Sequence, residues 1–267
     1  MRVLAVARKE VQESIYQIDE TEIKSGCTLL GLVGMIDPPR KEACQALKSC
    51  REAGIIVKMV TGDHPLTAET ISRNLGILSQ GKVISGSEMN LFNADMWKKA
   101  ANDNHVFARV SPTHKLKLVE ILQEAGYVVA MTGDGVNDAA ALKRADIGIA
   151  MGIKGTAVAK EASDMILADD NFASIESAVE EGRRVYDNLI KSLAFILPTS
   201  LGQALIIFLS VLFFPIHAGV LLHPMAPVQI LWVNLIVAVA LSLPLAFEST
   251  EPDIMRRPPR KKNVPVL

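Results

Sequence analysis

The sequence has no excess of charge of either sign, no cysteine framework and no apolar leader. Lys and Arg together number 28 and Asp and Glu 29, so the formal net charge is -1. That balance gives no electrostatic argument for a nucleic-acid partner. The three cysteines, Cys27, Cys44 and Cys50, lack metal-ligand spacing such as CxxC, which suits a reducing compartment and small buried side chains. The opening residues, MRVLAVARKE, lack the long apolar core of a secretory signal.

Charged residues are also missing from two long stretches in the second half of the chain. Residues 192–214 and 226–247 contain none, and each is long enough to cross the hydrocarbon core of a bilayer. The segment between them has no Lys or Arg, whereas basic residues flank the pair on its outer sides: Arg183, Arg184, Lys191, Arg256, Arg257, Arg260, Lys261 and Lys262. The positive-inside rule therefore predicts a transmembrane hairpin with both outer ends in the cytoplasm. The alternative is a pair of buried helices in a large soluble core.

The first half alternates short apolar runs with amphipathic stretches, which predicts an α/β domain. We expect buried strands at 28–36, 55–60, 105–110, 127–132 and 146–151, and helices at 40–54, 65–76, 112–125 and 136–144. The polar stretch 79–104 is expected to be an insertion with one helix. Strands buried on both faces with helices between them favour one parallel, Rossmann-like sheet. In such sheets, chemistry gathers where strands end at their carboxyl side.

The motif with the clearest chemistry is MTGDGVND, at 131–138. A strand is expected to end at Thr132, and the following glycines let the backbone approach a ligand closely. Asp134 stands where a carboxylate can hold Mg²⁺ beside a phosphoryl group, with Asn137 and Asp138 one helical turn further on. The alternative is an ordinary Gly-Asp-Gly turn.

A second motif, VTGDHPLTAETI at 60–71, also joins a strand to a helix. Thr61 and Gly62 end the strand, and Pro65 suits the first helical position. The Thr61 hydroxyl and the free N–H groups of the helix start form an anion site. The alternative is that Asp63 only caps the helix.

A third motif, FARVSPTHKLKLVEIL at 107–122, places Lys115 in the first turns of an amphipathic helix. Lys115 could reach a phosphate from there, whereas Lys117 is expected on the surface. The spacing alone does not separate the two lysines.

Together these motifs, with DPPR at 37–40, MGIKGTAVAKEASDMILADDNFASI, ILWVNL and DIMRRPPR, resemble P-type cation-transporting ATPases. The similarity is to the type II, calcium-pump-like bacterial branch and covers essentially the whole chain. It implies a partial haloacid dehalogenase-type phosphorylation domain followed by two membrane helices. Asp134 would bind Mg²⁺, and Asn137 and Asp138 would support the phosphate site, with Asp138 as a second candidate ligand.

The resemblance also implies roles for Thr61, Gly62 and Asp63 in the loop contacting the phosphoryl group, and for Lys115 in neutralising its charge. ATP would be the substrate, bound mainly by other parts of the pump, and the phosphorylation domain would be cytoplasmic at the cell membrane. The implied organisation is the tail of a nucleotide-binding domain (1–25), phosphorylation domain (26–171), stalk helix (172–191), fifth and sixth membrane helices (192–214 and 226–247), and a cytoplasmic tail (248–267).

The chain departs from the family in two respects. The DKTGT signature that carries the phosphorylated aspartate does not occur, so we expect a truncated fragment that needs the missing N-terminal part and is inactive alone. Neither membrane stretch contains a carboxylate, although Ser200, Gln203 and Asn234 can supply oxygens to a transported cation. They can equally act as interhelical hydrogen-bond partners. Pro198 should free carbonyl groups nearby.

Two other functions remain open from the sequence. A membrane-tethered phosphatase of the same superfamily would need a nucleophilic aspartate, and Asp37 is the nearest candidate, although it lies in DPPR. The other is a non-catalytic membrane fragment. Neither reading identifies the ion.

Overall fold

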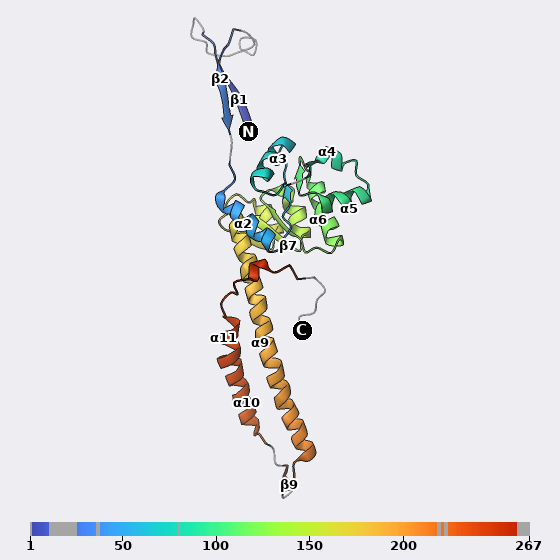
Figure 1. Ribbon diagram of the computed structural model, residues 1–267, viewed down its shortest axis with the longest axis vertical. Helices are drawn as coiled ribbons and strands as arrows, with labels where there is room; N and C mark the ends of the chain where they lie inside the picture. The colour runs from blue at the N-terminus through green and yellow to red at the C-terminus, as the bar shows by residue number, and fades with distance from the viewer. Residues whose placement is uncertain are drawn as a thin grey trace.

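The computed structural model of the protein describes residues 2–10, 26–35, 38–79, 81–217, 220–221 and 224–260. Three parts follow one another along its long axis: a two-stranded ribbon, an α/β domain and a pair of long helices (Figure 1). Asp37, Lys261, Lys262 and residues 11–25, which the sequence analysis singles out, lie outside the described residues.

The N-terminal ribbon corrects one sequence prediction. Strand β1 (Arg2–Arg8) pairs antiparallel with β2 (Thr28–Met35), and the two extend away from the α/β domain (Figure 1). The stretch 28–36 was expected to be a buried strand of the parallel sheet, yet Leu32 is 68% exposed. An apolar run shows that a strand can be buried, but burial also requires covering elements, and none covers β2 among the described residues.

The α/β domain contains two three-stranded parallel sheets. One has the order β3-β5-β4, and the other has the order β6-β7-β8. Their bounds are Met59–Val60 (β3), Ile84–Ser85 (β4), Val106–Ala108 (β5), Ala130–Gly133 (β6), Ile147–Met151 (β7) and Met165–Leu167 (β8). The α/β class and the parallel pairing are confirmed. The prediction of one continuous sheet is not confirmed, because β3 and β6 each lack a neighbouring strand on one side within the described residues.

The helices of the domain follow the predicted rhythm. They are α2 (Lys41–Glu52), α3 (Pro65–Asn74), α4 (Gly86–Met89), α5 (Ala94–Asp103), α6 (Pro112–Glu124), α7 (Ala139–Arg144) and α8 (Ala157–Ala162), with a 3₁₀ turn, η1 (Val136–Asp138), before α7. The insertion 79–104 has two helices and β4 rather than one helix. Side-chain caps explain both starts, since Ser85 Oγ accepts from Glu88 N (3.3 Å) and Asn93 Oδ1 from Met96 N (2.9 Å).

The core forms around the central strands of the sheets. All three residues of β5 are completely buried, with Phe107 packed among Ile84, Trp97 and Leu118 on one side. A smaller cluster around Leu142 covers β7. Of the cysteines, only Cys50 is buried, while Cys44 is half-buried and Cys27 is exposed, so the expectation of three small buried side chains was wrong for Cys27.

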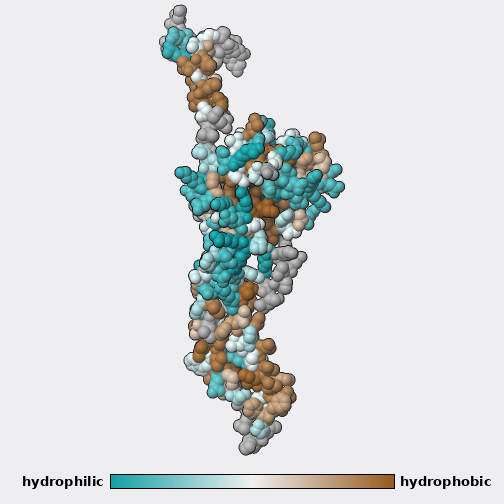
Figure 2. Space-filling model, in the orientation of Figure 1, coloured by the Kyte–Doolittle hydropathy of each residue, from teal (hydrophilic) through white to brown (hydrophobic). Residues whose placement is uncertain are grey.

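The third part is a helical hairpin. Helix α9 (Phe172–Phe213) runs unbroken through Pro198, and α10 (Pro227–Ile236), a π-helical segment η2 (Val237–Ser242) and α11 (Leu243–Ala246) form the returning helix. Two short strands, β9 (Ile216–His217) and β10 (Val220–Leu221), pair at the turn, and a 3₁₀ turn η3 (Ile254–Arg256) follows. Both helices are long and apolar enough to cross a membrane, and almost none of their most apolar stretches is buried, 6% in the first and 0% in the second. Hydrophobic surface gathers on this hairpin and on the ribbon (Figure 2), so the described residues do not bury the two helices in a soluble core.

Candidate functional site

The loop that follows β6 holds a carboxylate close against the backbone. Asp138 is buried, its N–H donates to Gly135 O (3.0 Å), and its Oδ2 accepts from Gly135 N (3.4 Å). A Cβ on Gly133 would lie only 2.5 Å from the Asp138 Cβ. Glycine at 133 is therefore needed for Asp138 to fold back over the end of β6, and the glycine-rich motif serves the packing of its own aspartate.

Lys115 reaches this carboxylate from another element. Its Nζ lies 2.5 Å from Asp138 Oδ1, and the two side chains are 15% and 8% exposed. An ion pair this buried is costly to break from one side, because the remaining charge stays desolvated. Lys117 lies two residues further along α6 and instead places its Nζ 4.7 Å from the centre of the Trp97 ring. Tertiary contacts thus separate two lysines that the sequence spacing left equivalent.

Asp134 presents a carboxylate to solvent beside this pair. Its side chain is exposed and makes no hydrogen bond or ion pair within the described part of the chain, as is also true of Asn137. The Asp134 carbonyl oxygen accepts from Thr156 N at 2.8 Å, which fixes the backbone of the loop. An exposed carboxylate on a fixed loop, with a second one buried nearby, fits Mg²⁺, which binds through one or two carboxylates and completes its shell with water and phosphate oxygens. No group of three His, Cys, Asp or Glu side chains placed to hold a metal ion occurs among the residues described, so water and phosphate oxygens would have to supply most of the shell.

The loop Thr61–Asp63 after β3 is held by the loop after β5. Thr61 O accepts from Val110 N (3.2 Å), Asp63 O accepts from Arg109 N (3.1 Å), and Thr61 Oγ1 accepts from Asp63 N (3.1 Å). Arg109 adopts a left-handed backbone conformation with φ of 49° to make this contact. These three hydrogen bonds fix the backbone of the loop.

The cap of α3 is His64, not Asp63. His64 Nδ1 accepts from Leu66 N at 3.3 Å, while the Asp63 side chain is exposed. The alternative reading of Asp63 as a mere helix cap is thus wrong in this structure, and its carboxylate is left available at the carboxyl end of β3.

The two loops are linked through α6. The hydrogen bonds of Arg109 and Val110 hold the Thr61–Asp63 loop, and the chain then enters α6, which carries Lys115 to Asp138. No direct hydrogen bond joins Thr61, Gly62 or Asp63 to 133–138 within the described ranges. The structure therefore pairs Lys115 with Asp138 in the loop that also carries Asp134, and keeps the Thr61–Asp63 loop one element away.

His114 is a residue that sequence reasoning missed. It accepts from Ser111 N through Nδ1 (3.3 Å), and its Nε2 lies 2.8 Å from Asn90 Oδ1, so it anchors the start of α6 one residue before Lys115. Burial, followed by the nearby Lys117 charge, lowers the pKa of His114, which favours the neutral ring that can accept this bond. The signal was a capping box with His in place of Glu or Gln.

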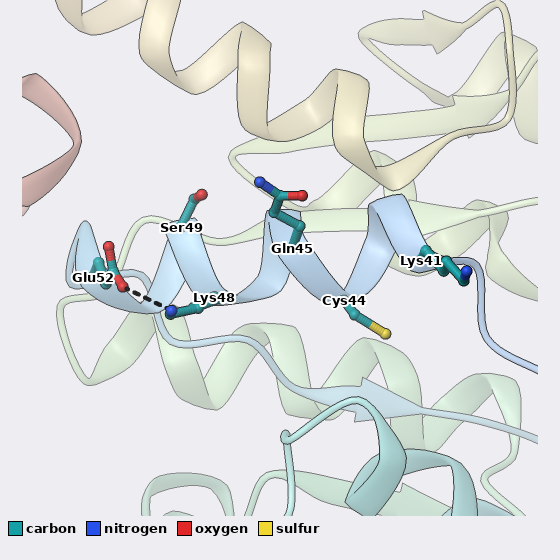
Figure 3. A pocket seen from close by; sticks show the side chains of 6 residues that line it. All are labelled: Lys41, Cys44, Gln45, Lys48, Ser49 and Glu52. Atoms are coloured by element: carbon teal, nitrogen blue, oxygen red, sulfur yellow. Dashed lines mark ion pairs between the residues drawn. The ribbon is translucent and has the colours of Figure 1, made fainter.

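A surface hollow of the domain lies away from this site. It lies along one face of α2 and is lined by Lys41, Cys44, Gln45, Lys48, Ser49 and Glu52 (Figure 3). Its single ion pair, Lys48 to Glu52 at 4.0 Å, joins residues one helical turn apart. No residue from 61–63 or 133–138 lines it, so its shape carries no chemistry of the site.

The polar residues of the membrane helices are not gathered into a site. Ser200 and Asn234 are exposed and Gln203 is half-buried, and none of the three hydrogen-bonds to another within the described residues. The π-helical segment begins three residues after Asn234, and Ser192 Oγ on α9 lies 3.4 Å from Ser242 O at its end. Such segments often occur at functional positions.

A junction below the domain joins both helices to it. Arg183 on α9 donates to Ala53 O (2.9 Å) at the end of α2, and to Ile254 O (2.8 Å) and Arg257 O (2.9 Å) in the segment after the hairpin. Asn188 donates to Ala246 O (3.2 Å) and Glu248 O (2.9 Å). The sequence marked Arg183 only as a basic flanking residue and did not single out Asn188, because their hydrogen-bond partners are 58 to 130 positions away.

Comparison with known proteins gives two family matches and several similar relatives. Residues 3–146 match the haloacid dehalogenase-like hydrolase family, and residues 222–267 match the C-terminal region of cation transporting ATPases. The chain is 52% identical over 269 residues to the cation-transporting ATPase pma1 of Synechocystis sp., which covers all of this chain and 29% of that relative. It is 46% identical over 262 residues to a calcium-transporting ATPase of Bacillus subtilis, covering 97% of the chain and 28% of the relative.

A fungal relative shows the same pattern. The endoplasmic reticulum calcium ATPase srcA of Aspergillus fumigatus is 45% identical over 251 residues, covering 92% of the chain and 25% of the relative. The chain thus spans less than a third of the length of these relatives. The chain belongs to the haloacid dehalogenase-like hydrolases, in the branch of the P-type cation-transporting ATPases.

Proposed function

We propose that this chain supplies the magnesium and phosphate side of an aspartyl-phosphate site in an ATP-driven cation pump, together with two of its membrane helices. The observation that carries the proposal is the buried Lys115–Asp138 pair beside the exposed Asp134 at the end of β6. These side chains hold one buried positive charge and two carboxylates where a parallel sheet presents its ligands.

Each residue has a distinct part in handling a phosphoryl group. Asp134, supported by Asp138 and Asn137, would hold Mg²⁺, which when bound neutralises and orients the phosphoryl oxygens. Lys115 stabilises the same negative charge from the α6 side, and the Thr61 hydroxyl and the Gly62 backbone N–H offer donors from the β3 loop, which the Asp63 N–H closes on Thr61 Oγ1. Phosphoryl transfer needs mainly such positioning and electrostatic stabilisation.

The nucleophile comes from outside these 267 residues, which contain no DKTGT. Strands β3 and β6 each have an unpaired side within the described residues, and this supports a site completed by a further parallel strand. The aspartate on that strand would bond to the γ-phosphorus of ATP as ADP leaves, and water would later release the phosphate.

The membrane-tethered phosphatase is the weaker reading. Its candidate nucleophile, Asp37, follows β2, which pairs antiparallel with β1 and joins neither parallel sheet. A nucleophile of this family is expected at the carboxyl end of a parallel strand, so the strand before Asp37 is the wrong kind of element.

The helical hairpin supports a place in the cell membrane with the α/β domain in the cytoplasm. Arg183, Arg184 and Lys191 precede the first apolar stretch, and Arg257 and Arg260 follow the second, on the same side of the bilayer. Ser200, Gln203 and Asn234 are the proposed oxygen donors for the transported cation, whose identity the two helices alone do not specify.

Metal binding and complementation test the proposal. Mn²⁺ prefers the same oxygen ligands as Mg²⁺ and should bind the purified chain in lipid nanodiscs. Electron paramagnetic resonance detects this binding. Asp134→Asn should abolish binding, and Asp95→Asn, exposed on α5, should not. The chain alone should not hydrolyse ATP.

Adding the remaining N-terminal part of the Synechocystis relative should yield a hydroxylamine-sensitive phosphoenzyme that Asp134→Asn suppresses. Turnover by the chain alone, lost in Asp37→Asn, would support the phosphatase instead. Unchanged Mn²⁺ binding in Asp134→Asn would overturn the assigned metal ligand.

A further inference from the structure

A short loop lies between the candidate metal-binding loop, residues 133–138, and the membrane helix α9. This return loop, residues 152–156, leaves β7 and leads into α8. Its Thr156 N–H donates to Asp134 O at 2.8 Å, so the return loop holds the backbone of the candidate metal ligand. The loop is tightly folded, because a Cβ on Gly155 would lie 1.9 Å from Met151 O.

The other side of the return loop is held by Asp170. Oδ1 of Asp170 accepts from Ile153 N (3.0 Å) and Oδ2 accepts from Lys154 N (2.8 Å). Both oxygens of one carboxylate are thus used on consecutive N–H groups, which fixes the orientation of the side chain. Charge-assisted hydrogen bonds of this type are stronger than neutral ones.

Asp170 is directly attached to the start of α9. It precedes Asn171, the N-cap residue, whose Oδ1 accepts from Ala173 N at 3.1 Å. Its backbone is left-handed, with φ of 50°, and its carbonyl oxygen accepts from Arg40 Nη1 at 3.4 Å. A non-glycine residue held in this conformation indicates that the surrounding contacts determine its position.

The neighbouring Asp169 makes only local contacts. Its Oδ2 accepts from Ser174 Oγ (2.5 Å) and its Oδ1 accepts from Asn171 N (3.1 Å). The first turn of α9 is therefore already capped by Asn171 and Asp169. Capping does not explain why the Asp170 carboxylate reaches 16 and 17 positions back along the chain.

We propose that Asp170 is a positioning residue that ties the return loop, and through Thr156 the Asp134 backbone, to the first turn of α9. Two steps of direct hydrogen bonding then connect the metal-binding loop to a continuous helix of 42 residues. Movement of the Asp134 loop on metal binding reaches the membrane helix through these contacts. The response of α9 to metal rests on the proposed function, whereas the hydrogen-bonded connection itself does not.

Matched variants separate the connection from general stability. Asp170→Asn keeps the left-handed backbone, which Asn tolerates, and removes one acceptor and the charge. Asp169→Asn is its control. At the other step, Thr156→Pro removes the N–H at a φ of -68°, which suits proline, and Thr156→Ala removes only the side-chain cap. The full chain is studied in nanodiscs by hydrogen–deuterium exchange.

The expected changes occur at a distance from each substitution. Asp170→Asn should speed exchange at the Gly135 and Asp138 amides about fivefold, since one charged acceptor is lost. Thr156→Pro should speed exchange at Ala173 and Ser174, whose amides bond to Asn171. Asp169→Asn should leave Gly135 and Asp138 unchanged, and Thr156→Ala should leave Ala173 and Ser174 unchanged.

Mn²⁺ supplies the readout that a purely structural role would not change. In the wild-type chain, Mn²⁺ should slow exchange at Ala173 and Ser174, and in Asp170→Asn it should slow exchange only near Asp134. Effects of Asp170→Asn confined to Ile153 and Lys154, or an Mn²⁺ response at α9 that persists in this variant, would overturn the proposal. If Mn²⁺ changes nothing anywhere, the proposed metal site fails, while the metal-free comparisons still decide on the connection.

Discussion

At the scale of residues, the site depends on one close approach and one buried charge pair. Lys115 and Asp138 come from elements 23 positions apart, and Gly133 makes room for the aspartate. The motifs predicted which residues are candidates for the site. They did not predict that Lys115 pairs with Asp138, or that His64 replaces Asp63 as the cap of α3, because such partners depend on how α6 and α3 pack.

Gly133→Ala should displace Asp138 and destabilise the α/β domain by about 1–3 kcal/mol, the usual range for inserting a methyl group where none fits. Trp97, which is 2% exposed in the domain core, reports unfolding by fluorescence once Trp232 in the second membrane helix is replaced by Phe. Gly135→Ala is the control, since its Cβ would lie 3.8 Å from the nearest atom of Asp138. Equal losses for the two variants would contradict the steric explanation.

Lys58 should make the stability of the domain depend on pH. Burial lowers its pKa to about 8, and its Nζ donates to Asn104 O at 2.7 Å. In the unfolded chain the pKa of a lysine is about 10.4. Between the folded and the unfolded pKa the unfolded state binds more protons than the folded state, so the free energy of unfolding rises with pH.

Thermal unfolding followed by Trp97 fluorescence checks the Lys58 prediction. Below the folded pKa the buried lysine stays charged at a cost in stability. Lys58→Met should therefore stabilise the domain relative to wild type most at about pH 7, and this gain should shrink by about pH 9.5. Lys99→Met, on the exposed side of α5, should show no such trend. A constant difference across this range would show that Lys58 stays charged.

At the scale of elements, sequence periodicity located the helices α2, α3, α6 and α7 and four of the six parallel strands of the domain. It failed at β2, which is exposed, and in the insertion 79–104, where Ser85 and Asn93 start two separate helices. Strand β8 and helix α8 were also missed, since each is short. Short elements are specified by caps and by neighbours rather than by a repeating apolar pattern.

Arg183→Gln should loosen the junction between α9, α2 and the segment after the hairpin. The guanidinium donates to three carbonyl groups from two segments, and each hydrogen bond to a charged group contributes about 1.5–3 kcal/mol. Hydrogen exchange should therefore rise in residues 251–258. Arg184→Gln removes only a pair with Glu181 on the same helix and should leave this segment protected; similar exchange in both variants would show that Arg183 is not the connecting residue.

At the scale of the whole molecule, one continuous helix connects the α/β domain to the apolar hairpin. Helix α9 covers both the stalk expected at 172–191 and the membrane stretch expected at 192–214, and α2 and η3 pack against it. This arrangement suits a rigid connection between the phosphate site and the bilayer. The ribbon, by contrast, exposes apolar side chains at the other end of the molecule (Figure 2).

Limited trypsin digestion tests the rigid connection. Arg183, Arg184 and Lys191 lie inside α9, so the folded chain in nanodiscs should resist cleavage after all three. Gly182→Pro should break the helix and expose the same bonds, which provides a positive control. Ready cleavage of the wild-type chain at these positions would show that a flexible linker, not a rigid helix, joins the two parts.

The sequence by itself determined the family, the α/β class, the two apolar helices and the identity of the candidate site residues, because motifs and periodicity are local properties of the chain. Only the tertiary structure decided that Lys115 pairs with Asp138, that β2 stands outside the parallel sheets, and that Asp170 and Arg183 connect distant segments. These contacts join residues from 16 to 130 positions apart. Their partners are chosen by packing and by the need to satisfy buried polar groups, which no local pattern records.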